Sequence, residues 1–182
     1  MKGYLRKIYI AEAMKLIDTL FVFTMIPFLF MSGCECYNSA CPYIERNDMS
    51  AVDTVNKFVD AINAHDVDAI GELMGNEHTF IDSSGGVYTD IEEMIKGWPG
   101  YYEMFPDYQI EISETFISGD TVILWGSASG TYSSDGTLRP ENHWEIPAAW
   151  KAIVKGDKIK LWQVIADNSI VVEIMQKDEK IN

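Results

Sequence analysis

The chain has 182 residues, of which 47% are hydrophobic and 23% are charged. This length corresponds to about one domain, and the composition is that of a globular protein, which excludes a disordered chain, a collagen and a coiled coil. Acidic residues outnumber basic ones by 28 to 14, for a net charge of −14. Because phosphate binding needs clustered Lys and Arg, we expect no nucleic-acid partner.

Residues 1–33 are interpreted as a signal peptide. Basic residues near the start precede an apolar run, Leu20 to Met31, which is too short to span a membrane comfortably. The following segment, Met31-Ser32-Gly33-Cys34, resembles a bacterial lipobox, in which a Cys is lipidated and becomes N-terminal. We therefore expect an exported protein that Cys34 attaches to a membrane. A plain secretory signal and an uncleaved anchor are the alternatives.

Residues 34–48 are predicted to be a tether, residues 49–176 the folded domain and residues 177–182 a polar tail. The three cysteines, Cys34, Cys36 and Cys41, all precede the domain. If Cys34 is lipidated, the other two can form a disulfide in an oxidising compartment. Three clustered thiols and three scattered His do not have the spacing of a metal site, so we expect neither metal nor cofactor.

The first half of the domain has helical patterns. Ser50 and Asp53 have the spacing of a capping box, which predicts that a helix begins at Ser50. Asp66 is the predicted N-cap of a second, short helix, and Thr89 or Asp90 that of a third. We expect Pro99-Gly100 to interrupt the third helix and Phe105-Pro106-Asp107 to end it. Between the second and third helices lie a brief strand, residues 79–81, and a turn, residues 82–86.

The second half of the domain is predicted to consist of extended segments. Their ranges are 108–117, 121–132, 142–154 and 158–174, and turn residues such as Gly119-Asp120 and Gly156-Asp157 separate them. Helices followed by a meander predict an α+β fold, in which three N-terminal helices pack on the concave face of one strongly curved antiparallel sheet.

Several segments carry a resemblance to a known superfamily: residues 58–70, Phe105-Pro106-Asp107, residues 144–152 and residues 162–168. In this order and spacing, residues 50–175 resemble the nuclear transport factor 2-like superfamily. Its cone-shaped, cystatin-like α+β barrel is shared by ketosteroid isomerases and SnoaL-like polyketide cyclases. The resemblance implies a pocket inside the cone.

The resemblance places Asp82 where ketosteroid isomerases have their general base. However, Phe58 and Trp150 stand where those enzymes have a Tyr and a protonated Asp that stabilise an enolate, and the catalytic Asp of the cyclases is also absent near Trp150. Asp82 can alternatively form a turn by accepting from the amides of Ser84 or Gly85.

The isomerase register points Trp125, Ser127, Trp150 and Trp162 into the cone, where the indoles would bind a flat apolar ligand. Alternatively, the Trp side chains simply fill the core. Other candidates are weaker. They comprise His78 on the wall near Asp82, His143 and Glu145 if Pro147 makes a bulge that turns them inward, and Tyr101 or Tyr102 in a lid over the cone. We expect a binder of a small apolar molecule, with a cofactor-independent isomerase, cyclase or lyase and a dimeric interaction module as alternatives.

Overall fold

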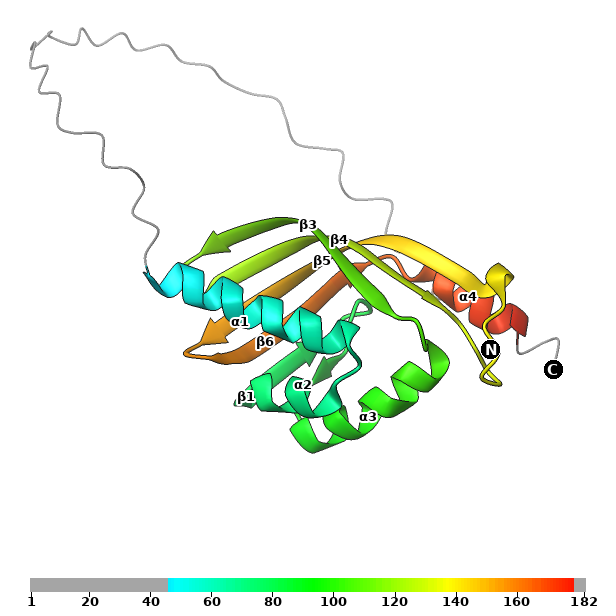
Figure 1. Cartoon of the computed structure of the whole chain (residues 1–182), viewed down its shortest axis with the longest axis horizontal. Helices are drawn as coiled ribbons and strands as arrows, with labels where there is room; N and C mark the ends of the chain where they lie inside the picture. The colour runs from blue at the N-terminus through cyan, green and yellow to red at the C-terminus, as the bar shows by residue number, and fades with distance from the viewer. Residues whose placement is uncertain (1–45, 179–182) are drawn as a thin grey trace, which may run out of the picture. The chain divides into compact units, whose positions relative to one another are not determined.

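The computed structural model describes residues 46–178, which form an α+β domain around one curved six-stranded sheet (Figure 1). The strand order is β2-β1-β6-β5-β4-β3. This confirms the predicted fold class. The predicted signal peptide, the lipidation site Cys34 and most of the tether lie outside the described residues.

Of the first two helices, only the second begins where its N-terminal signal predicted. α1 (Arg46–Asn63) begins before the predicted start, and Ser50 lies inside it, where its carbonyl accepts a hydrogen bond from Thr54 Oγ1 at 3.0 Å. The predicted capping box is therefore wrong. α2 (Val67–Leu73) begins as predicted, because the Asp66 carboxylate accepts from the Ala69 amide at 3.0 Å.

The third helix, α3 (Ile91–Met104), is capped by Asp90 and continues through Pro99. The predicted interruption at Pro99-Gly100 is wrong, because packing on both sides of the proline holds the helix together and overrides its weak local propensity. Trp98 stacks on Tyr102 with ring centroids 5.3 Å apart, and Tyr101 packs against Phe105 at 5.1 Å. The helix ends at Met104, as predicted.

The sheet consists of β1 (Met74–Ile81), β2 (Val87–Tyr88), β3 (Gln109–Ser118), β4 (Thr121–Thr131), β5 (His143–Lys155) and β6 (Lys158–Ala166). A short 3-10 helix, η1 (Pro140–Asn142), precedes β5. All neighbouring strands are antiparallel except β1 and β6, which pair in parallel. The turns at Gly119 and Gly156 have φ of 57° and 66°, values that glycine adopts without strain.

The described residues end in a helix that the sequence pattern missed. β6 stops at Ala166, and α4 (Ser169–Asp178) replaces the second half of the extended segment predicted for residues 158–174. Val171 and Ile174 face the core at helical spacing, but their β-branched side chains are also typical of strands. Asp178 fastens the helix by accepting hydrogen bonds from Ser134 and Asn142.

β3 and β4 approach each other closely at Gly126. The pairing register of these strands shifts between Ile112 and Glu114, and Gly126 lies opposite that irregularity. A Cβ at Gly126 would lie only 1.8 Å from the carbonyl oxygen of Glu111. Only glycine permits this approach. Glycines inside strands often mark such a bulge or a close approach of another backbone segment.

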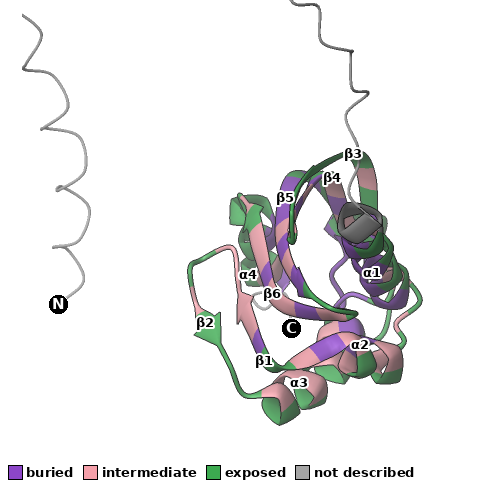
Figure 2. Ribbon diagram, turned by 90° about the vertical axis from the view of Figure 1, so that its left-hand side faces the viewer, coloured by how far each residue is buried: buried purple, intermediate pink, exposed green. Residues whose placement is uncertain are grey.

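α1 packs against the inner side of the curved sheet, and buried residues concentrate on α1, β4 and β5 (Figure 2). Asn63, at the end of α1, holds the start of β3 through two hydrogen bonds with the Ile110 backbone, at 2.8 and 2.9 Å. Within residues 46–178, no helix is long and apolar enough to cross a membrane. The same residues contain no group of three or more His, Cys, Asp or Glu side chains arranged to hold a metal ion.

Candidate functional site: the cone cavity

A cavity of about 840 Å³ opens between the inner face of the sheet and the helices α1, α3 and α4. Its wall is mainly apolar and aromatic. The Phe, Tyr and Trp side chains that line it are Phe58, Phe80, Tyr88, Trp98, Tyr101, Phe105, Tyr108, Trp144, Trp150 and Trp162.

Four of the predicted ligand-binding residues line this cavity: Phe58, Tyr101, Trp150 and Trp162. Phe58 comes from α1 and packs edge-on against Trp162 of β6, with ring centroids 5.1 Å apart. Trp150 of β5 is only 1% exposed. One helix and two strands thus bring together side chains that are about 100 positions apart in the chain.

The predicted inward facing of Trp125 and Ser127 is wrong. Leu124, not Trp125, pairs with Trp150, so Leu124 shares the inner face and Trp125 points outward with 54% of its surface exposed. Side chains alternate along a strand, so a difference of one residue in register reverses the facing of every residue on β4.

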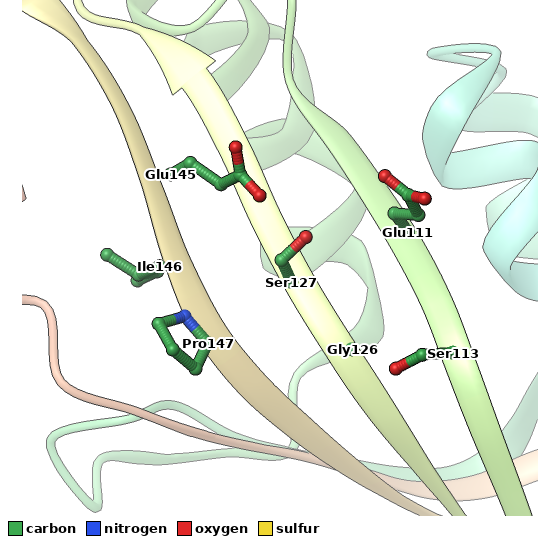
Figure 3. A pocket seen from close by; sticks show the side chains of 7 residues that line it. All are labelled: Glu111, Ser113, Gly126, Ser127, Glu145, Ile146 and Pro147. Carbon is green, nitrogen blue, oxygen red and sulfur yellow. The ribbon is translucent and has the colours of Figure 1, made fainter.

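Ser127 and Glu145 lie instead in a hollow of about 490 Å³ on the outer face of β3, β4 and β5 (Figure 3). Pro147 introduces no bulge, because the β4–β5 pairing runs without a shift from Thr121 and Ile153 to Thr131 and His143. The predicted entry of His143 and Glu145 into the cavity mouth is therefore wrong. Both side chains are exposed.

Asp82 lines the rim of the cavity, but its carboxylate is engaged in the turn that follows β1. Oδ1 accepts from the amides of Ser84 and Gly86, both at 2.8 Å, and Oδ2 accepts from the Tyr88 hydroxyl at 3.0 Å. Slight burial raises the pKa of Asp82, but the hydrogen bonds together outweigh it and hold the pKa below its ordinary value. A carboxylate stabilised in its charged form is a weak base.

His78 lies deeper in the cavity wall and is 1% exposed. Its Nδ1 is 2.7 Å from the carbonyl oxygen of Ile159 on the neighbouring strand. Burial lowers the pKa of His78 and outweighs the opposing effect of this hydrogen bond, so the neutral imidazole is favoured.

Three tyrosines at the α3 end of the cavity are neutral hydrogen-bonding groups. Burial raises the pKa of Tyr101 and of Tyr102, and it raises that of Tyr108 to about 12. The Tyr102 hydroxyl donates to the carbonyl of Ile62 at 3.0 Å and does not line the cavity. Tyr101 is hydrogen-bonded to Tyr108, and both side chains do line it.

The charges at the cavity are all negative. Asp82, Asp90 and Glu93 are among the lining residues, whereas no Lys or Arg is. Two buried indole nitrogens in the wall, Nε1 of Trp144 and Nε1 of Trp150, have no hydrogen-bond partner among the described residues. An unpaired buried donor typically costs about 1–3 kcal/mol, so each is a group that a ligand acceptor would satisfy if it came within reach.

Sequence reasoning missed Trp98, Tyr108 and Trp144 as cavity residues. A signal for Trp144 was present, because it lies six residues before Trp150 on the same strand and an unbroken strand must face both side chains inward. Tyr108 and Trp98 carried no such signal, since their orientation depends on how α3 packs onto the sheet.

The curved sheet, the helices on its inner side and the cavity between them define a nuclear transport factor 2-like cone fold. A family model described as a SnoaL-like domain matches residues 55–162. The chain therefore belongs to the SnoaL-like domain family. No curated protein matches it.

Solved structures share this fold at low sequence identity. A hypothetical protein with a ketosteroid isomerase-like fold from Catenulispora acidiphila, in complex with trimethylamine, is 20% identical, and the match covers 66% of this chain and 90% of that one with a TM-score of 0.58. A candidate SnoaL-like polyketide cyclase from Shewanella denitrificans is 13% identical over 70% of this chain and 97% of its own, with a TM-score of 0.61. An LEH-like epoxide hydrolase from M. tuberculosis is 12% identical over 71% and 92%, with a TM-score of 0.59. At these identities, the likeness shows a common fold only.

Proposed function

We propose that this SnoaL-like domain binds a small, uncharged, apolar or aromatic molecule in its cone cavity. The observation that carries the proposal is the cavity itself, about 840 Å³ in volume and lined mainly by apolar and aromatic side chains. Ligand sites are typically concave and mainly apolar, with volumes of about 300–1,000 Å³ and a few polar groups that orient the ligand.

The charges at the cavity support an uncharged ligand. Asp82, Asp90 and Glu93 at the cavity repel an anion, and no cationic side chain lines the wall to pair with one. In the apolar interior, an unpaired charge of either sign would be costly to bury.

Binding can be tested on the full-length protein with the neutral dye N-phenyl-1-naphthylamine, following the quenching of tryptophan emission. We expect saturable quenching, because Trp144, Trp150 and Trp162 line the cavity. Ala166→Phe adds a ring inside the cavity, whereas Ile165→Phe makes a matched change on the outer face, where Ile165 is 55% exposed. Ala166→Phe should weaken binding at least tenfold and Ile165→Phe should not. Equal affinity in both variants would refute cavity binding.

The alternative of a cofactor-independent isomerase, cyclase or lyase with Asp82 as general base has less support. The Asp82 carboxylate already accepts three hydrogen bonds, and its lowered pKa makes it a poorer proton acceptor. We propose that Asp82 mainly shapes the turn at the cavity rim.

We also propose that two copies associate through the outer face of the sheet. Trp125, Ala149 and Ile165 form a row across β4, β5 and β6, because each pairs with the next in register. Trp125 and Ile165 are both more than half exposed. The same face carries Lys151 and Glu145, and a face with charges of both signs can complement itself across a twofold axis.

Sedimentation of the full-length protein tests this association. We expect a dimer that Trp125→Ser dissociates, whereas Val87→Ser on the exposed strand β2, at the opposite edge of the sheet, leaves it intact. A strictly monomeric wild-type protein at high concentration would contradict the proposal.

Export and lipidation remain proposals from the sequence of residues 1–34. The apolar segment and Met31-Ser32-Gly33-Cys34 support a lipid on Cys34 that anchors the domain to a membrane. The intact mass of membrane-extracted protein should show cleavage before Cys34 and the added lipid. Cleavage of Cys34→Ser at the same site as the wild type, with masses that differ only by the substituted side chain, would contradict lipidation.

A further inference from the structure

The protonation of His78 follows from its single hydrogen bond. Nδ1 is 2.7 Å from the carbonyl oxygen of Ile159, and a carbonyl oxygen can only accept. Nδ1 must therefore carry a proton and donate it. In a neutral imidazole the other nitrogen, Nε2, then has a lone pair and acts as an acceptor.

The surroundings of His78 favour this neutral form. The side chain is 1% exposed, and its ring neighbour is Phe58, with ring centroids 6.3 Å apart. No carboxylate is hydrogen-bonded to it, and Nε2 has no partner among the residues that the structure describes. A buried imidazole without an anionic partner stays neutral, because burial penalises the charged form.

His78 thus brings a neutral acceptor to the wall of the cavity. The indoles of Trp144 and Trp150 can only donate, the carboxylates of Asp82, Asp90 and Glu93 carry a charge, and the hydroxyl and amide groups that line the cavity can both donate and accept. His78 is the neutral imidazole among the lining residues and lies next to the aromatic wall formed by Phe58 and Trp162.

We propose that Nε2 of His78 accepts a hydrogen bond from a hydroxyl group of the cavity ligand, so that the ligand is an uncharged, mainly apolar molecule with a hydroxyl, such as a phenol or an alcohol. This inference rests on the proposed function and narrows its ligand class. An ammonium group could also donate, but the imidazole has no carboxylate beside it to offset the cost of burying that charge.

The protonation state can be tested without any ligand by ¹⁵N NMR of the histidine side chains. We expect His78 to show a protonated Nδ1 and an unprotonated Nε2 at neutral pH, and His78→Asn identifies its signals by their loss. The opposite tautomer or a charged imidazole would overturn the proposal.

The ligand preference can be tested with 2-naphthol and 2-methoxynaphthalene, two uncharged compounds of similar size of which only the first can donate. Equilibrium dialysis of the full-length protein should show about tenfold tighter binding of 2-naphthol. This ratio corresponds to the upper end of the usual net free energy of one hydrogen bond. In His78→Asn the amide nitrogen can replace the Nδ1 donor to Ile159, so the fold is kept, while the amide oxygen lies closer to the backbone than Nε2 and supplies no acceptor at the Nε2 position. The preference should then fall to twofold or less.

His143→Asn is the matched control. Because His143 is exposed on the outer face, its replacement should leave the preference for 2-naphthol unchanged. An unchanged preference in His78→Asn would overturn the inference, as would equal binding of both compounds to the wild type, while the proposed function would stand. If neither compound nor the dye binds, the proposed function itself fails.

Discussion

Gly126→Ala tests the close approach of β3 and β4 at Gly126. The new Cβ would lie 1.8 Å from the Glu111 carbonyl oxygen and 2.9 Å from its carbon, and both are backbone atoms that cannot rotate away. To relieve the overlap, the strands must separate by more than 1 Å, which weakens their hydrogen bonds. Overpacking costs about 1–3 kcal/mol and sometimes more, whereas burying a methyl group returns only about 0.8 kcal/mol.

We therefore expect Gly126→Ala to lower the free energy of unfolding by about 3 kcal/mol, a large part of the ~5–15 kcal/mol typical of a domain. Urea denaturation followed by tryptophan fluorescence measures it. With a slope of about 1–3 kcal/mol per molar urea, the midpoint should fall by roughly 1–3 M.

Gly97→Ala is the matched control. Gly97 lies in α3, and a Cβ there meets nothing within 4 Å. Alanine in a helix is favoured over glycine by about 0.5–1 kcal/mol, so this variant should be slightly more stable than the wild type. A free energy of unfolding for Gly126→Ala within about 0.5 kcal/mol of the wild-type value would show that the strand contact is not as tight as described.

Three further changes probe the anchor of α1, the buried imidazole and the rim carboxylate. Asn63→Ala removes both hydrogen bonds to the Ile110 backbone and should lower the free energy of unfolding, measured by thermal denaturation, by about 1–3 kcal/mol. An unchanged melting temperature would show that these bonds are dispensable. Burial holds the pKa of His78 in the folded protein below its ordinary value of 6.5. Between the folded and the unfolded pKa, the unfolded chain therefore binds more protons than the folded one. The contribution of His78 to the free energy of unfolding is thus complete above about pH 6.5 and is lost as the pH falls through that range. The acid-side loss of stability should be smaller in His78→Asn, and identical pH profiles would contradict this. Asp82→Asn should lower stability by about 1 kcal/mol while leaving the affinity for N-phenyl-1-naphthylamine within twofold; lost binding without unfolding would instead place Asp82 in the ligand site.

Local signals in the sequence determined much of the fold. Asp66 and Asp90 cap their helices because a side-chain carboxylate satisfies amides two or three residues away, an interaction that needs no distant partner. The turn at Asp82 follows for the same reason, and the hairpin at Gly119 follows because glycine adopts a positive φ without strain. The order of these elements was sufficient to predict the curved α+β fold.

The tertiary structure alone decided what faces the cavity. Whether Leu124 or Trp125 points inward depends on which residue of β5 lies opposite, and that register is set across the long connection between β4 and β5. The acceptor on His78 exists only because β1 lies beside β6, whose Ile159 carbonyl accepts a hydrogen bond from Nδ1 of the ring. Both depend on strands that meet only after folding, so no local pattern of residues could specify them.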